Sequence, residues 1–204
     1  MQDPEAAARE LARCVGELGF KGAMVNGFTQ KDVPDKVIYY DAPEYRPFWA
    51  VVEDLDVPFY LHTRTTVAAR ARAYEGHPWL FAPAWDFAAE ASVHALRLIC
   101  SGLFDEFPRL KLVLGHLGER IPYDIWRIDN LMGKAPLKHP ARKPVGDYLR
   151  TNFHLTTSGQ FHDPTFQCAI AEMGVDRILF AIDYPFEFSE DAATWFDGTA
   201  LSHG

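Results

Sequence analysis

Two histidines and one aspartate are of types that bind divalent metal ions. His62 follows the apolar run at residues 57–61, His116 follows the run at 110–114, and Asp183 follows the run at 177–182. Neutral imidazole nitrogens and carboxylate oxygens are common ligands of such metals. Each residue alone also has a simpler explanation, such as a core histidine with a satisfied ring nitrogen. Their shared position after apolar runs favours a common metal site.

The segment from Gly115 to Arg120 could perform acid–base chemistry. It places the His116 imidazole, the Glu119 carboxylate and a guanidinium next to glycines that allow a tight turn. The alternative is an ordinary turn in which Glu119 and Arg120 form a solvated ion pair. Asp183 ends a wholly apolar run, so its carboxylate would be partly desolvated unless a cation or a hydrogen-bond donor meets it.

The elements that must position these residues are short strands alternating with amphipathic helices. Helices are predicted at residues 4–18, 47–53, 87–104, 123–132 and 165–173, and strands at 22–25, 57–61, 110–114, 153–157 and 177–182. Such alternation predicts parallel strands buried on both faces, in a barrel or a doubly wound sheet. Polar residues at the strand ends favour the barrel, whose strand ends meet at one mouth. These residues are Asn26, His62, His116, Ser158 and Asp183.

The composition limits the possible partners. With 204 residues, 48% of them hydrophobic, a single domain over residues 1–204 is expected. A net charge of −8 and a pI near 5.4 argue against nucleic acid and anionic membranes as partners. The cysteines Cys14, Cys100 and Cys168 lie far apart, which predicts buried free thiols. Without a signal-like or membrane-spanning run, a cytoplasmic location is expected.

Several segments in order resemble a known family. Residues 59–62, 115–119, 126–129, 156–159 and 177–187 are similar to the γ-resorcylate and 2,3-dihydroxybenzoate decarboxylases of the amidohydrolase superfamily. The resemblance covers nearly the whole chain. It implies an α/β fold, a TIM-like (β/α)8 barrel of the metal-dependent hydrolase type. It also implies nonoxidative decarboxylation of a hydroxybenzoate to a phenol and carbon dioxide.

The same resemblance implies roles for individual residues. His62 and Asp183 would bind one divalent ion, zinc, manganese or magnesium. His116, Glu119 and Asp183 would be catalytic, with an acid such as Asp183 protonating the ring carbon. Arg127 would contact the substrate's carboxylate, and Asn26 and Phe186 are further expected substrate contacts. The expected partners are a small aromatic carboxylic acid and further copies of the chain, in a homodimer or homotetramer.

Two departures from the family pattern affect these expectations. Thr63 stands where the family commonly has proline, and no strand with a Glu-x-His arrangement is found. We therefore expect an incomplete barrel, with about five of eight strand–helix units, lacking the first strands and the last helix. Weak metal binding follows, because only two ligands are expected. The alternatives are a metal-dependent hydrolase of the same superfamily and a truncated chain without catalytic activity.

Overall fold

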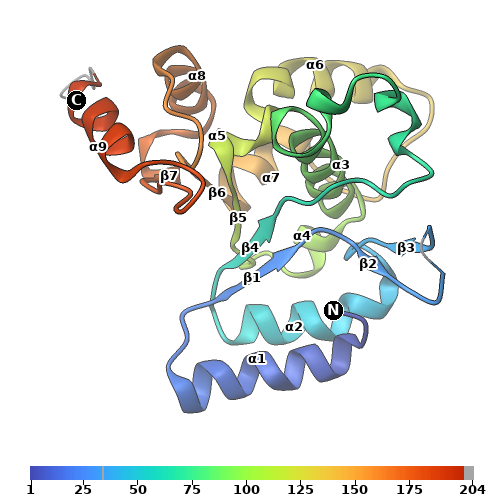
Figure 1. Cartoon of the computed structure of the whole chain (residues 1–204). Coiled ribbons are helices and arrows are strands. Elements are labelled where there is room, and N and C mark those ends of the chain that lie inside the picture. Colours follow the sequence, from blue (N-terminus) through green and yellow to red (C-terminus); the bar gives the residue numbers. More distant parts are fainter. Residues whose placement is uncertain (34, 200–204) are drawn as a thin grey trace.

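The computed structural model describes residues 1–33 and 35–199, in which helices and short strands alternate (Figure 1). The helices are α1 (Pro4–Leu18), α2 (Arg46–Asp54), α3 (Asp86–Cys100), α4 (Leu103–Glu106), α5 (His116–Glu119), α6 (Ile121–Lys134), α7 (Val145–Asn152), α8 (Asp163–Met173) and α9 (Ser189–Gly198). The strands are β1 (Ala23–Asn26), β2 (Thr29–Gln30), β3 (Val37–Ile38), β4 (Phe59–His62), β5 (Leu112–Leu114), β6 (Phe153–Thr156) and β7 (Ile178–Leu179). Within the described ranges, no helix is both long and apolar enough to span a membrane.

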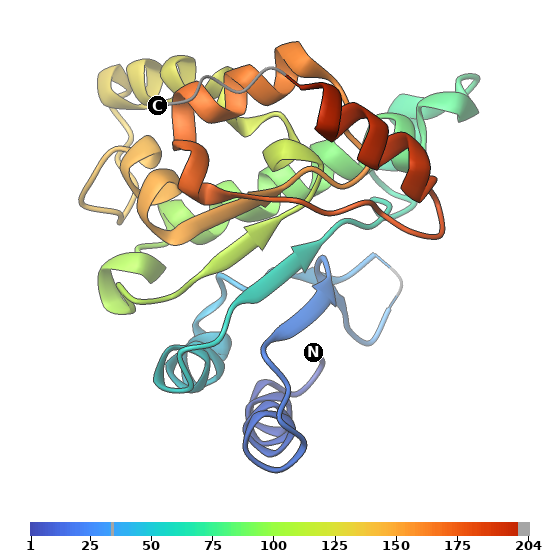
Figure 2. The ribbon, with the colours of Figure 1, turned by 90° about the vertical axis from the view of Figure 1, so that its left-hand side faces the viewer.

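Five strands form one parallel sheet in the order β1-β4-β5-β6-β7 (Figure 2). Each of the five apolar runs contributes one of these strands, so the predicted α/β alternation is confirmed. The order follows the chain, as it does in a barrel and not in a doubly wound sheet, where the order reverses. The structure adds a small antiparallel pair, β2 with β3, that the sequence analysis did not predict.

The side chains of the sheet alternate between an apolar core and a polar face. In β4, Phe59 and Leu61 are fully buried in the core, whereas Tyr60 and His62 are only half-buried. Successive side chains of a strand point to opposite faces, so this pattern places His62 away from the helices that pack on Leu61. The prediction of strands buried on both faces is therefore wrong for part of the sheet.

The helices begin and end where local chemistry permits. In α1, the Asp3 side chain accepts a hydrogen bond from the Ala6 amide at 2.9 Å, and Gly19 ends the helix at φ 71°. The single helix predicted at 87–104 is divided into α3 and α4, because Gly102 adopts φ 78° between them. Helix α7 was not predicted. Its first amides, at Val145 and Gly146, donate to the Asp129 carboxylate.

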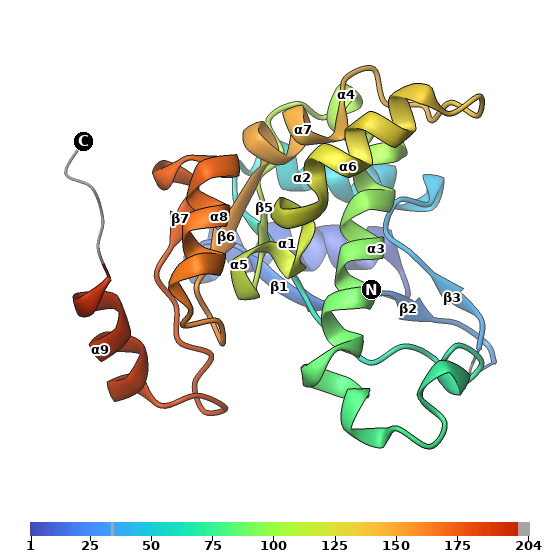
Figure 3. The same ribbon diagram turned by 90° about the horizontal axis from the view of Figure 1, so that it is seen from above.

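The two ends of the sheet differ in their surroundings. Helices α1 and α2 lie side by side next to β1, and α8 and α9 lie beyond β6 and β7 (Figures 1 and 3). The outer strands still expose apolar side chains, including Met24 on β1 and Leu179 on β7, at 63% and 46%. The three cysteines are free, as predicted, but half-buried where the sequence analysis expected them to be buried.

Candidate active site

The turn after β5 is held in an unusual backbone conformation. His116, Leu117, Glu119 and Arg120 all have positive φ, between 49° and 70°, and Gly118 lies at 87°. Left-handed backbone costs roughly 1–2 kcal/mol for each residue other than glycine. Such strain persists only where the surroundings enforce it, and it occurs often at functional sites. A right-handed helical turn here would place His116 and Glu119 differently.

This turn brings His116 between two carboxylates. Its Nδ1 lies 2.6 Å from Glu119 Oε1, and its Nε2 lies 3.6 Å from Oδ2 of Asp183, which follows β7 by four residues. Burial lowers the pKa of His116, but the hydrogen bond to Glu119 and the charges of both carboxylates outweigh this effect. The net result is a pKa above the ordinary histidine value, which favours a protonated imidazole.

Glu119 and Arg120 have separate partners. The Glu119 residue is only 2% exposed and pairs with His116, while the Arg120 guanidinium lies 3.9 Å above the Trp85 ring. The alternative of a solvated Glu119–Arg120 ion pair is therefore wrong. A buried carboxylate needs such a partner, because an isolated buried charge is costly.

His62 is oriented by a residue of the neighbouring strand. Its Nδ1 lies 2.9 Å from Asn26 Oδ1, and the register pairs Asn26 with His62 across β1 and β4. An amide oxygen only accepts hydrogen bonds, so Nδ1 carries the proton and Nε2 keeps its lone pair. Metal-ligating histidines commonly have this arrangement.

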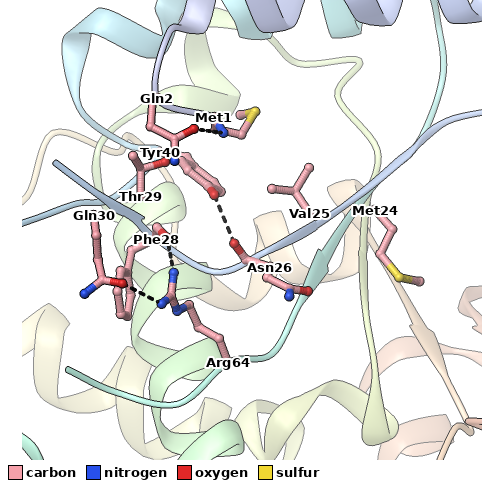
Figure 4. A pocket seen from close by; sticks show the side chains of 10 residues that line it. All are labelled: Met1, Gln2, Met24, Val25, Asn26, Phe28, Thr29, Gln30, Tyr40 and Arg64. Atoms are coloured by element: carbon pink, nitrogen blue, oxygen red, sulfur yellow. Dashed lines mark hydrogen bonds between the residues drawn. The ribbon is translucent and has the colours of Figure 1, made fainter. Parts of the chain in front are cut away.

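Asn26 is itself fixed from its other side (Figure 4). The Tyr40 hydroxyl donates to the Asn26 backbone oxygen at 3.0 Å. Arg64 donates to the Phe28 backbone oxygen and to Gln30, at 2.7 and 3.0 Å. These residues surround a smaller cavity of about 420 Å³. Asn26 therefore lines this smaller cavity and contacts His62 through its side chain. It does not line the larger cavity, to which His62 belongs.

His62, His116, Glu119 and Asp183 line one large cavity of about 1370 Å³. Its walls include the aromatic residues Trp85, Phe87, Tyr123 and Phe186. Of the predicted substrate contacts, only Phe186 lies here. Asn26 acts on His62, and Arg127 lies exposed on α6, outside the cavity lining. The sequence analysis assigned no site role to Trp85, Gln160 or Cys168, which also line the cavity, because nothing in their spacing marks them.

Gly159 is needed next to the charged pair. A Cβ atom at this position would lie 3.1 Å from His116 Cδ2 and 3.2 Å from Asp183 Oδ2, and Gly159 also has φ 61°. Any larger residue would push into the space between His116 and Asp183. The strand end at Ser158-Gly159, which the sequence analysis recognised as part of a motif, is therefore part of the site.

The residues present fit a divalent metal only in part. His62 offers an imidazole nitrogen and Asp183 a carboxylate, a set that suits zinc, manganese or magnesium. Across the described ranges, however, no three His, Cys, Asp or Glu side chains form a group that could hold a metal ion. The shared three-ligand cluster of His62, His116 and Asp183 is not formed. The expected weak metal binding stays a prediction.

Parallel strands in barrel order, with His62, His116 and Asp183 at or shortly after their carboxyl ends, are typical of α/β barrels, whose sites lie at this end of the strands. The family model described as amidohydrolase matches residues 1–203. The chain belongs to this amidohydrolase family, which confirms the predicted membership, and its sheet is the expected incomplete barrel.

Individual relatives are similar over nearly the whole chain. The γ-resorcylate decarboxylase of a Rhizobium species is 54% identical over 204 residues, covering 99% of this chain and 62% of the relative. A dihydroxybenzoic acid decarboxylase of a Polaromonas species, solved with manganese and 2-nitroresorcinol, matches with a TM-score of 0.96 and 54% identity, over 100% of this chain and 62% of that one. A 2,6-dihydroxybenzoate decarboxylase solved with 2,6-dihydroxybenzoate gives 0.95 and 54%, over 99% and 63%. The chain thus spans less than two thirds of each relative.

Proposed function

We propose that this protein is a metal-dependent, nonoxidative decarboxylase of hydroxybenzoates, with 2,6-dihydroxybenzoate as the first substrate to test. The observation that carries the proposal is the convergence of Glu119, His116 and Asp183 on a cavity with aromatic walls. Support comes from relatives whose names state this activity, at 54% identity. The proposed location is the cytoplasm, and the proposed assembly is a homodimer or homotetramer.

His62 and Asp183 are the residues that would hold the metal ion. A bound divalent cation supplies positive charge that holds a substrate's carboxylate and neighbouring hydroxyl in place. Manganese is the ion to test first, because the similar Polaromonas structure contains it. Asn26 would fix the ring of His62 through its amide oxygen.

The chain's own residues would supply the proton. Asp183 would take a proton from His116 and transfer it to the ring carbon that bears the carboxylate. The bond between that carbon and the carboxylate then breaks, its electron pair restores the aromatic ring, and carbon dioxide leaves. His116, whose pKa the Glu119 partner raises, lies 3.6 Å from Asp183 and would supply this proton, and solvent would then protonate His116 again. General acid catalysis of this kind contributes roughly 10²- to 10⁴-fold in rate.

The cavity walls would select an aromatic acid. Phe186 lies at the wall and would contact the ring, as predicted from the resemblance. Arg127 as the contact for the carboxylate stays a prediction, since α6 holds it outside the cavity lining. Arg120 does line the cavity and would add positive charge near the bound acid.

The test is the reaction itself. The purified chain is incubated with MnCl2 and 2,6-dihydroxybenzoate, and resorcinol and carbon dioxide are measured. We expect both in equal amounts, and a loss of at least about 100-fold in Asp183→Asn, because the acid is removed. Asp176→Asn is the matched control. Asp176 is exposed and lies just before β7, which Asp183 follows, so this variant should behave as wild type. Cleavage of esters or lactones without carbon dioxide would favour a hydrolase, and no turnover of any kind would favour a noncatalytic chain.

A further inference from the structure

Helix α3 and the residue before it contact two consecutive residues of the strained turn, Glu119 and Arg120. The Trp85 ring, directly before α3, lies under the Arg120 guanidinium at 3.9 Å. The Ser92 hydroxyl donates to the Glu119 backbone oxygen at 2.6 Å. Trp85 stands at the N-cap of α3 and Ser92 lies in its second turn, so the first half of α3 lies against the strained turn.

The Ser92 contact acts on the backbone that aims the Glu119 carboxylate. Glu119 and Arg120 both have positive φ, at 52° and 70°, so the peptide group between them is held in an orientation that these residues rarely adopt. If this peptide group turned toward the usual right-handed region, its oxygen would leave the Ser92 hydroxyl. The Glu119 side chain would then move away from His116, which it contacts at 2.6 Å.

The same hydroxyl also contacts the Ala88 backbone oxygen of its own helix. A serine hydroxyl has one proton to donate, so the two carbonyl oxygens share it. Bonding within the helix occurs in many helices and has no consequence for a distant residue. The contact with Glu119 is the one that connects α3 to the candidate site.

We propose that Ser92 is a positioning residue, which holds the left-handed turn at Glu119 and thereby fixes the His116–Glu119 pair. The chemical role of that pair rests on the proposed function, whereas its geometry does not. Ser92 is not itself a lining residue of the large cavity, and it reaches Glu119 only at the backbone oxygen, so the effect of its removal would be transmitted through the Glu119 backbone.

The test compares Ser92, within α3, with Ser101, the residue that caps the C-terminal end of the same helix. Ser92→Ala removes the contact with Glu119, while Ser101→Ala removes only a hydroxyl that donates to Leu98 within the helix at 2.8 Å. Ring nitrogen shifts of His116 are recorded by long-range proton–nitrogen NMR on the metal-free chain, with the signal assigned by its change in Glu119→Gln. This readout needs no turnover, so it holds even if the proposed decarboxylation fails.

We expect Ser92→Ala to shift the His116 Nδ1 resonance toward the position seen in Glu119→Gln, and Ser101→Ala to leave it unchanged. Where turnover is measurable, kcat should fall roughly 10- to 100-fold in Ser92→Ala with little change in KM, as expected for misplaced catalytic groups. If the alanine variant does not fold, Ser92→Cys replaces it, because cysteine keeps the size of the side chain and is a weaker hydrogen-bond donor. Ser92→Thr keeps the hydroxyl and should give the wild-type spectrum. Wild-type His116 shifts in folded Ser92→Ala or Ser92→Cys, or equal changes in Ser101→Ala, would overturn the proposal.

Discussion

At the scale of single residues, the candidate site depends on which proton each group holds. Glu119 is buried and His116 lies between it and Asp183, so the imidazole is stabilised in its charged form. Burial alone would favour the neutral ring. The two carboxylates reverse this preference, and His116 can therefore hold a proton above the pH at which an ordinary histidine loses it.

Replacing Glu119 with glutamine should remove most of this effect. The amide keeps the size of the side chain but not its charge, so the pKa of His116 should fall and decarboxylation should slow by roughly 10²- to 10⁴-fold. The pH dependence of kcat/KM in Glu119→Gln measures the change, with Glu75→Gln, an exposed loop variant, as control. An unchanged rate and pH profile would show that Glu119 has no part in proton transfer.

Asn26 should affect metal binding through His62. Its amide oxygen accepts the His62 Nδ1 proton at 2.9 Å, and loss of such a partner typically weakens metal binding 10- to 100-fold. Titration of Mn²⁺ into Asn26→Ala, followed by calorimetry, should show this loss, whereas Asn26→Asp keeps an accepting oxygen and should bind at least as well as wild type. Equal affinity in Asn26→Ala would mean that His62 is not a ligand or needs no orientation.

At the scale of the elements, α3 combines site residues with a buried histidine. His94 accepts a hydrogen bond from the Tyr40 amide at 3.0 Å and is 1% exposed, so it packs as part of the core. Burial and the nearby Arg97 lower the pKa of His94 from 6.5 to about 3. The folded chain therefore keeps this ring neutral under conditions in which the unfolded chain protonates it.

This difference predicts a loss of stability in acid. The contribution of His94 is complete above pH 6.5 and is lost as the pH falls from there toward 3, at up to about 1.4 kcal/mol for each pH unit. Urea unfolding between pH 7.5 and 4.5 measures it. His94→Gln, which keeps an acceptor for the Tyr40 amide and cannot titrate, should show a shallower decline. Parallel curves for the two proteins would contradict the assignment.

The elements also show what could be predicted from the sequence. Apolar periodicity located α1 and the five sheet strands, because this signal is local. The left-handed turn at 116–120 could not be predicted, since four of its five residues are not glycine and only contacts from distant segments enforce it. For the same reason, Ser92 carries no signal in the sequence: its partner is 27 residues away.

At the scale of the whole molecule, the sheet is open where a barrel is closed. Strands β1 and β7 are its two edges, and Met24 and Leu179 on them are exposed. The chain spans about 62% of the length of its curated relatives. Of the candidate site, the strand-end residues His62, His116 and Asp183 were predictable, because parallel strands bring their carboxyl ends to one rim. The distances between these side chains could not be predicted, and neither could the position of Arg127 outside the cavity lining.

The central claim is that His62 and Asp183 hold a cation next to the His116–Glu119 pair. The most direct measurement is anomalous diffraction at the manganese edge from crystals of this chain soaked in MnCl2 at millimolar concentration. The strongest peak should lie between the His62 imidazole and the Asp183 carboxylate, within the large cavity, and should disappear in His62→Ala. A strongest peak elsewhere in the molecule, or one that persists in His62→Ala, would contradict the account.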